Sequence, residues 1–186
     1  KTLKGIIKET NYATSQYEKR PILTGVNFKH EEDKLFCVAT DSYRLSQKIL
    51  PLSTDFEPFN IVIPNKSLDE LSRIIDSVNE DVEIYISPNK VLFKFNDILF
   101  QTRLLDGVYP DTLRIIPTEF PIIIKFNKDE LLRSVERVSL LSPKDRENNY
   151  NIIKLMVKKD YSVEISSTNT EIGDAQEVII PTDDVV

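Results

Sequence analysis

The sequence predicts an α+β protein assembled from a repeated unit of one helix and several short strands. Three segments carry apolar residues at helical spacing, and short apolar or alternating segments separated by polar turns follow each of them. The order recurs at an offset of about 130 residues, which indicates internal repetition. Hydrophobic content of 40% and charged content of 29% over 186 residues suit one large or two ordinary domains. Periodicity alone leaves open that such units recur by chance in an α+β protein.

The first unit is expected to begin with a helix over residues 1–13. Its apolar residues share one stripe, and Lys4 and Lys8 lie one turn apart beside it. The polar run at residues 29–34, which contains His30, is predicted to be a turn. Strands are expected over residues 22–28, 35–40 and 44–50. A strand before Lys1 would complete a strand–helix–strand–strand–strand unit.

The second unit contains all five elements, starting with a strand over residues 59–63. Ser67 and Glu70 have the spacing of a capping box, which predicts a helix start and an apolar side that continues to Val78. Three strands, over residues 82–86, 91–95 and 98–104, follow with tight turns between them, as in an antiparallel meander.

The third unit follows a turn at residues 106–111. A strand is expected over residues 121–126, and a helix over residues 128–141. The buried side of that helix is predicted to consist of Leu131, Leu132, Val135, Val138 and Leu141. The remaining strands are expected over residues 152–157, 161–166 and 175–180.

The composition argues against several chemistries. Four glycines are few for a phosphate loop, which needs close backbone approach. Cys37 is the single cysteine, so it can form neither an intramolecular disulfide nor a cysteine-based zinc site, and its apolar neighbours predict a buried, inert thiol. His30 is the single histidine, so a Ser-His-Asp or Cys-His site would need it as the base. No catalytic site, metal or cofactor is predicted.

Charge and hydropathy constrain the partners and the location. A net charge of −6 and a pI near 5.0 argue against a protein that coats nucleic acid with its whole surface, but they allow bases gathered on one face. There is no apolar run of about eighteen residues and no visible signal peptide. We therefore expect a cytoplasmic protein without a membrane partner.

Six separated segments keep the order and approximate spacing of one known family. They are RPILTGV at 20–26, ATDSYRLS at 39–46, VIPNKSLDEL at 62–71, RLLDGVYPDTLRIIP at 103–117, LLRSVERVSLLS at 131–142 and ISSTNTEIGDAQE at 165–177. Together they resemble the bacterial sliding clamps, the beta subunits of DNA polymerase III, and the wording is closest to clamps of low-GC Gram-positive bacteria.

The resemblance implies a DNA-clamp fold, with antiparallel sheets outside and helices inside. It implies that residues 1–118 are the central of three domains without its first strand, and that residues 119–186 are the first part of a truncated carboxy-terminal domain. Family members form a homodimeric ring around double-stranded DNA without reading its sequence. They tether the polymerase III alpha subunit, the clamp loader and other clamp-motif proteins in DNA replication, and they need no catalytic residue for this.

The resemblance also carries over the pocket for the short hydrophobic clamp-binding peptide. Leu23, Leu45 and Ile115 would form its apolar floor. Two departures bear on its shape, because Ser42 and Tyr43 stand where many clamps have Gly and His. Leu23 and Leu45 could equally be ordinary core residues, and the family's carboxy-terminal pocket residues are missing here, which predicts weakened peptide binding. The pocket maps to Leu23, Thr40, Ser42, Tyr43, Arg44, Leu45, Pro110, Arg114 and Ile115.

Two further surfaces are implied. Cations on the three predicted helices would track phosphates in the ring's hole, although an ordinary solvated helix face explains them as well. The loop before the first strand also matches family positions that contact DNA. A Leu-Leu pair at a helix end, with an acidic residue on a nearby strand, matches the family's dimer interface, although core packing explains the leucines nearly as well. The DNA-facing residues are Lys4, Lys8, Tyr17, Arg20, Pro21, Ile22, Lys66, Arg73, Arg133 and Arg137; the interface residues are Leu140, Leu141 and Glu177.

Two alternatives to a clamp stay open. One is a non-clamp α+β module that binds peptides as an adaptor. The other is a hydrolase that uses Asp41, Asp106 and Asp111 as paired acid and base. Asp106 and Asp111 bracket a glycine and a proline, however, so turn formation explains them without catalysis.

Overall fold

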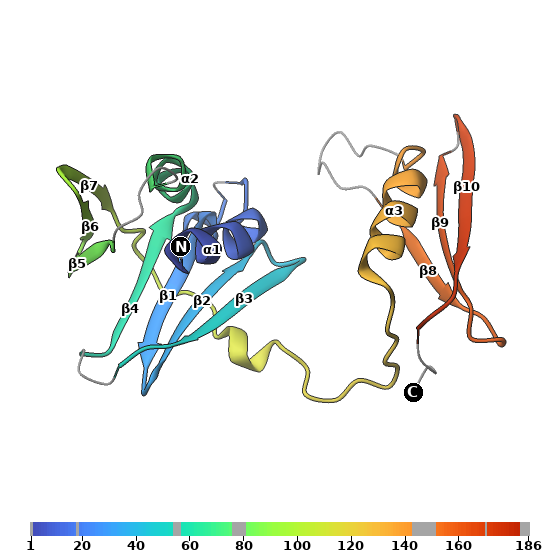
Figure 1. The fold of residues 1–186 in the computed structure, drawn as a ribbon, viewed down its shortest axis with the longest axis horizontal. Coiled ribbons are helices and arrows are strands. Elements are labelled where there is room, and N and C mark those ends of the chain that lie inside the picture. The colour runs from blue at the N-terminus through green and yellow to red at the C-terminus, as the bar shows by residue number, and fades with distance from the viewer. Residues whose placement is uncertain are drawn as a thin grey trace. The chain divides into compact units, whose positions relative to one another are not determined.

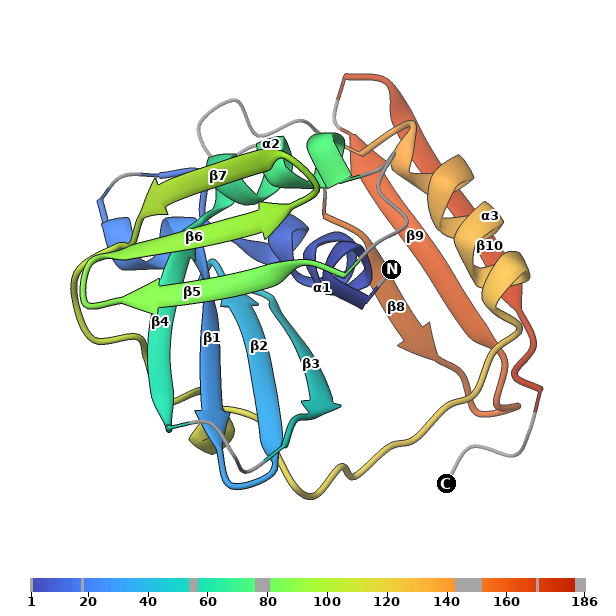
Figure 2. The same ribbon diagram turned by 60° about the vertical axis from the view of Figure 1, so that its left-hand side comes forward.

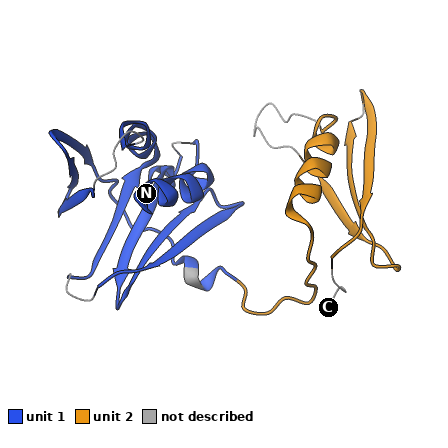
Figure 3. Ribbon diagram, in the orientation of Figure 1, with its two compact units in different colours: residues 1–116 blue, residues 117–186 orange. Residues whose placement is uncertain are grey.

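The chain folds as two compact units, residues 1–116 and 117–186 (Figure 3). The computed structural model describes residues 2–17, 19–53, 57–75, 81–142, 152–169 and 171–182. Within those ranges no helix is both long and apolar enough to cross a membrane.

In its described residues, the first unit contains two α-helices and two antiparallel sheets (Figure 1). One sheet has the strand order β3-β2-β1-β4 and the other β5-β6-β7. The helical elements are α1 (Thr2–Thr10), α2 (Asn65–Ile74) and the short 3-10 turns η1 (Asn11–Ala13), η2 (Pro21–Thr24) and η4 (Thr112–Arg114). The strands are β1 (Gly25–Glu31), β2 (Lys34–Thr40), β3 (Leu45–Pro51), β4 (Phe59–Pro64), β5 (Glu83–Ser87), β6 (Lys90–Phe95) and β7 (Ile98–Arg103).

One core joins both helices of this unit to both sheets. Strand alternation sends Val26 and Phe28 of β1 towards the helices, where they meet Leu68 and Leu71 of α2, and Phe93 of β6 fills the same core. Gly25 is required at the start of β1, because a Cβ there would lie 2.5 Å from the Ile63 carbonyl oxygen. The predicted burial of Cys37 is confirmed, and burial raises the pKa of its thiol to about 12.

The second unit packs one helix on a three-stranded antiparallel sheet (Figure 2). The elements are α3 (Lys128–Ser139), β8 (Lys154–Val157), β9 (Val163–Asn169) and β10 (Gly173–Ile179), in the strand order β10-β9-β8. Asn127 caps α3, because its Oδ1 accepts hydrogen bonds from the backbone N–H groups of Asp129 and Glu130. Val138 of α3 packs on Ile165 of β9 in the core of this unit.

Two predictions about the first hairpin were wrong. The expected strand over residues 22–28 begins only at Gly25, because the preceding residues form η2. The expected turn over residues 29–34 is shorter, because β1 continues to Glu31 and pairs with Lys34. His30 is therefore a buried strand residue beside Phe59, with the two ring centroids 5.7 Å apart, and not a loop residue.

The predicted capping box is not formed. Helix α2 begins at Asn65, whose Oδ1 accepts from the Lys66 N–H, while the Ser67 hydroxyl lies 2.7 Å from the Thr102 hydroxyl. Val78, at the end of the predicted helix, lies outside the described residues.

Several helix and strand bounds in the third unit also differ from the predictions. Residues 121–126 form no strand; in the described part of the chain, the Lys125 carbonyl accepts one backbone hydrogen bond, from Thr182, and a strand needs a continuous partner. Helix α3 ends at Ser139 rather than at 141, and Leu132, expected on its buried side, is exposed. Strands β8, β9 and β10 each begin or end about two residues from their predicted bounds.

Candidate functional site

An apolar cluster lies on the face of the β3-β2-β1-β4 sheet that points away from the helices. Its buried members include Leu23, Val38 and Val62, and Leu45 packs against them at the edge. The cross-strand register explains this face, because Val38 and Val62 both pair with Asn27, whose neighbours in β1 point into the core on the other side. A sheet with apolar residues on both faces needs a cover on each.

The segment that follows β7 supplies this cover. The Leu105 N–H donates to the Val62 carbonyl (2.9 Å), and the Tyr109 hydroxyl accepts from the Thr40 N–H (3.1 Å). Tyr109 is buried in the cluster, and this burial raises the pKa of its hydroxyl to about 12. Tyr109 was not among the site residues predicted from the sequence, although an aromatic residue inside a Gly-Val-Tyr-Pro turn is a signal for such a buried anchor.

A tight turn at residues 41–44 forms the rim beside this cluster. The Asp41 carboxylate accepts from the N–H groups of Tyr43 and Arg44, each at 3.0 Å, and the Thr40 hydroxyl donates to the Arg44 carbonyl. Although partial burial acts in the opposite direction, the bonds from Arg44 and Tyr43 lower the pKa of Asp41. Ser42 occupies the left-handed region with φ of 79°.

The nine predicted pocket residues all lie in the first unit, and they divide into two groups. Leu23, Thr40 and Leu45 belong to the cluster or its edge. The exposed members are Ser42, Tyr43, Arg44, Pro110, Arg114 and Ile115. Ile115 is 59% exposed and is not part of the described apolar cluster, so the floor expected from Leu23, Leu45 and Ile115 joins only two of the three.

The two predicted rim arginines have partners within the unit. The Arg44 guanidinium donates to Asp41 and, at 2.8 Å, to the carbonyl of Tyr12, and it also lies over the Tyr12 ring. Arg114 pairs with Asp111 at 3.0 Å and is highly exposed. Arg44 is therefore held against the end of the first helix. The exposed ion pair of Arg114 contributes little free energy, so Arg114 can leave Asp111 and pair with a ligand instead.

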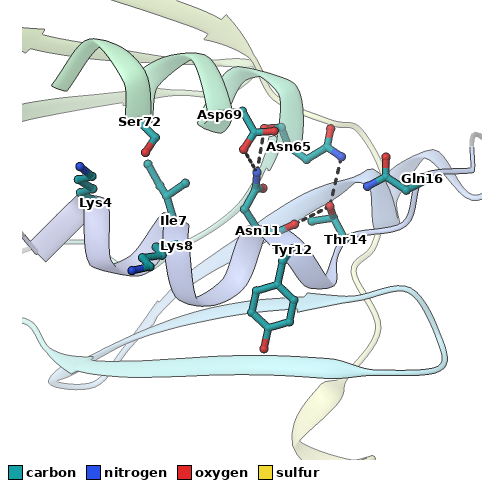
Figure 4. Close-up of a pocket in the computed structure, with 10 residues that line it drawn as sticks. All are labelled: Lys4, Ile7, Lys8, Asn11, Tyr12, Thr14, Gln16, Asn65, Asp69 and Ser72. Carbon is teal, nitrogen blue, oxygen red and sulfur yellow. Dashed lines mark hydrogen bonds between the residues drawn. The ribbon is translucent and has the colours of Figure 1, made fainter. Parts of the chain in front are cut away.

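A groove lies between α1 and α2 (Figure 4). Lys4 and Lys8, both predicted to face DNA, line it on the α1 side. Asn11 bridges the two helices: its Nδ2 donates to Asp69 (2.7 Å) and to the Asn65 carbonyl (3.1 Å). The groove has a cavity volume of about 490 Å³.

The other predicted DNA-facing residues have different surroundings. Lys66, Arg73 and Arg133 are exposed on their helices, and Tyr17, Arg20 and Pro21 are exposed in the segment before β1. Ile22 packs against the outer apolar cluster. Arg137 forms an ion pair with Glu177 through two nitrogens, so its charge already has a partner.

The predicted dimer residues are placed within the second unit. Leu140 follows α3 and is 80% exposed, while Leu141 is half-buried. Glu177, on β10, carries the ion pair to Arg137, and the hydrogen bond from that guanidinium lowers the pKa of the carboxyl to about 2. The exposed Leu140 side chain can thus contact a second protomer, whereas Glu177 could pair with one only by weakening its ion pair with Arg137.

Two of the three residues of the hydrolase alternative have structural roles. Asp41 closes the turn at residues 41–44, and Asp111 pairs with Arg114. The described residues contain no group of three or more His, Cys, Asp or Glu side chains that could hold a metal ion. This arrangement favours binding surfaces over a site for acid–base chemistry.

The sequence matches two family descriptions along its length. Residues 1–111 match the DNA polymerase III beta subunit, central domain, and residues 113–184 match its C-terminal domain. Similar curated proteins include the Beta sliding clamp of Bacillus subtilis (strain 168), 46% identical over 96% of this chain and 47% of the relative. The Beta sliding clamp of Staphylococcus aureus (strain N315) is 43% identical over 96% of this chain and 46% of the relative.

Solved structures give the same result. The DNA polymerase sliding clamp from Bacillus subtilis matches with a TM-score of 0.89, and the DNA polymerase III beta chain from Streptococcus pneumoniae with 0.90. Each is 45% identical and covers 100% of this chain and 48% of that chain. The predicted α+β clamp fold and the resemblance to clamps of low-GC Gram-positive bacteria are confirmed. The chain spans about half the length of the curated relatives it matches.

Proposed function

We propose a function from one premise: the chain belongs to the DNA polymerase III beta subunit family. In this proposal the whole protein is a ring-shaped processivity factor that encircles duplex DNA and holds replication proteins on it. It works as an accessory subunit without a chemical step. Residues 1–118 act as the central domain and residues 119–186 as part of the carboxy-terminal domain.

The observation that carries the proposal is the difference between the two faces of the β3-β2-β1-β4 sheet. One face is covered by α1 and α2, on which Lys4 and Lys8 line a groove. The other face carries the apolar cluster around Leu23, bordered by the exposed turn at residues 41–44. A protein that must hold DNA and a partner peptide at the same time needs such separate surfaces.

The helix face supports sequence-independent contact with duplex DNA. Lysine and arginine side chains neutralise phosphates without reading bases, and their contribution falls as salt rises. With a net charge of −6, the chain has few places where a polyanion is attracted, so clustered cations define the side that it approaches. We assign this role to Lys4, Lys8, Lys66 and Arg73 on this face, and the same role to Arg133 on the helix of the second unit.

The outer cluster supports binding of a short hydrophobic peptide. Leu45 packs at the edge of the cluster and is only partly buried, and Arg114, which follows the segment that covers the cluster, is exposed. An apolar side chain that docks there would bury more of Leu45, while Arg114 can meet a carbonyl or carboxylate of the peptide. The polymerase III alpha subunit and the clamp loader are the proposed partners.

The exposed Leu140 supports the proposed ring closure. A large apolar side chain that is 80% exposed at a helix end is a favourable contact for a second protomer. Homodimerisation through Leu140, with Leu141 and Glu177 beside it, is therefore part of the proposal.

The test of the peptide pocket is a double substitution in the full-length protein. Leu45→Ala with Arg114→Ala removes an apolar contact and a rim cation, so the affinity for a clamp-motif peptide, measured by calorimetry, should fall about tenfold or more. Leu99→Ala with Arg103→Ala on β7 makes the matched control, because both residues are exposed outside the proposed pocket. Equal affinities in the two double variants would show that the pocket lies elsewhere.

A further inference from the structure

We infer that the groove between α1 and α2 holds an unpaired nucleotide of a DNA strand, in addition to any contact with duplex phosphates. This inference rests on the proposed function, because it takes the helix face as the side that DNA approaches. The groove has a cavity volume of about 490 Å³. A water molecule occupies about 30 Å³ of liquid volume, so a base with its sugar has room there.

One wall of the groove combines cations with an aromatic ring. Lys4, Lys8 and Tyr12 follow each other at intervals of four residues along α1 and η1, and all three line the groove (Figure 4). Single-stranded DNA is bound by cations that follow the backbone and by aromatic rings on which bases stack. Tyr12 is 58% exposed, so part of its ring is open to such stacking.

The position of the Tyr12 ring is fixed from the sheet side. The Arg44 guanidinium carbon lies 5.7 Å from the ring centroid, and Arg44 also donates to the Tyr12 carbonyl. A ring held this way loses little conformational freedom when a base stacks on it.

The part of the groove where η1 meets α2 offers hydrogen-bond acceptors. Asn11 is only 8% exposed, and its Oδ1 has no hydrogen-bond partner among the described residues. A buried acceptor without a partner costs about 1–3 kcal/mol, which a ligand with an N–H group would recover. Asp69 lies next to it, held by the Asn11 amide. The ligand for this wall must therefore bring N–H donors.

An unpaired base meets this requirement and a paired base does not. In a duplex the Watson–Crick N–H groups are already bonded to the opposite strand, whereas an unpaired base presents them to the protein. The cytosine edge carries an amino group, while the thymine edge carries two carbonyl oxygens around a single N–H. Facing acceptors at Asn11 and Asp69, cytosine should bind better than thymine.

The test compares fluorescently labelled oligo(dC) and oligo(dT) of equal length by anisotropy on the full-length protein, at about pH 8, where cytosine is neutral. We expect oligo(dC) to bind about fivefold more tightly than oligo(dT). Asp69→Asn keeps a carbonyl acceptor for Asn11 but removes the carboxylate, so the ratio should approach one. Loss of a charge alone would change both affinities equally, so the ratio separates the two effects.

A second set of variants tests the ring. Tyr12→Leu should weaken both oligonucleotides about fivefold but leave duplex binding unchanged, while Tyr12→Phe, which keeps the ring, should retain the affinity. Tyr85→Leu on β5 is the matched control, because Tyr85 is exposed to a similar degree at 50%. Equal binding of the two oligonucleotides by the unsubstituted protein would overturn the inference, as would equal effects of Tyr12→Leu on single strands and duplex. Failure of the clamp function would appear separately, as loss of retention on circular duplex DNA.

Discussion

The guanidinium of Arg137 on α3 donates two hydrogen bonds to the carboxylate of Glu177 on β10. Nη2 lies 2.7 Å from Oε2, and Nε donates to Oε1. From the sequence, Arg137 is expected on the DNA-facing surface and Glu177 at the dimer interface. The two side chains are partners within one unit, so neither charge reaches DNA or a second protomer without weakening this pair. Both assignments stay predictions.

This ion pair should make stability depend on pH. The hydrogen bond from Arg137 lowers the pKa of Glu177 to about 2, so the ionised carboxylate favours the folded state. Its contribution is present above the ordinary carboxyl pKa and is lost as pH falls from about 4.5 towards about 2. The melting temperature of the unsubstituted protein should therefore fall more steeply over that range than that of Glu177→Gln. Parallel curves would show that the pair contributes nothing to folding.

Removing the Tyr109 hydroxyl should destabilise the first unit. Tyr109→Phe keeps the ring in the apolar cluster but leaves the buried Thr40 N–H without its acceptor. An unpaired buried donor costs about 1–3 kcal/mol, which urea denaturation would show as a lower midpoint with an unchanged slope. Tyr161→Phe in the second unit, where the ring is exposed, is the control. A midpoint equal to that of the unsubstituted protein would mean that Thr40 finds another partner.

Glycine at position 42 should relieve backbone strain. Ser42 has φ of 79°, a region that disfavours side chains by about 1–2 kcal/mol, and the greater freedom of glycine in the unfolded chain offsets part of this gain. Ser42→Gly should raise the free energy of unfolding by less than about 1 kcal/mol. A clear loss of stability would show that the Ser42 side chain makes a contribution larger than the strain.

Alanine substitutions at Leu23 and Leu45 should show which of the two residues stabilises the core and which contributes to peptide binding. Leu23 is 3% exposed, so Leu23→Ala should cost about 2–4 kcal/mol in the free energy of unfolding, through lost burial and a residual cavity. Leu45 lies at the edge of the cluster, so Leu45→Ala should cost less but reduce peptide affinity more directly. If Leu45→Ala destabilises the fold as much as Leu23→Ala, Leu45 is a core residue first.

The sequence predicted the order of elements because alternation and helical spacing are local properties. The helix around Leu68 and Leu71, and the paired strands that follow it, came from such patterns. Where an element depends on a distant partner, the pattern failed. Residues 121–126 form an apolar run typical of a strand but have no neighbouring strand in the described chain. The turn expected around His30 is shorter because β1 pairs as far as Lys34.

The same limit applies to the candidate site. The family motifs located the turn at residues 41–44 and the exposed Arg114, but not the hydrogen bond that ties Tyr109 to Thr40 across 69 residues. Nor could spacing indicate that Asn11 bridges to Asp69, 58 residues away, because such contacts arise only when the helices pack.

The most direct test of the proposed function is retention of the full-length protein on DNA of two topologies. After loading on nicked circular duplex DNA, the protein is separated by gel filtration before and after the circle is cut at one site. A ring that holds DNA by encircling it should stay on the circle and slide off the cut DNA. Equal loss from both forms would contradict the clamp and favour a peptide-binding adaptor.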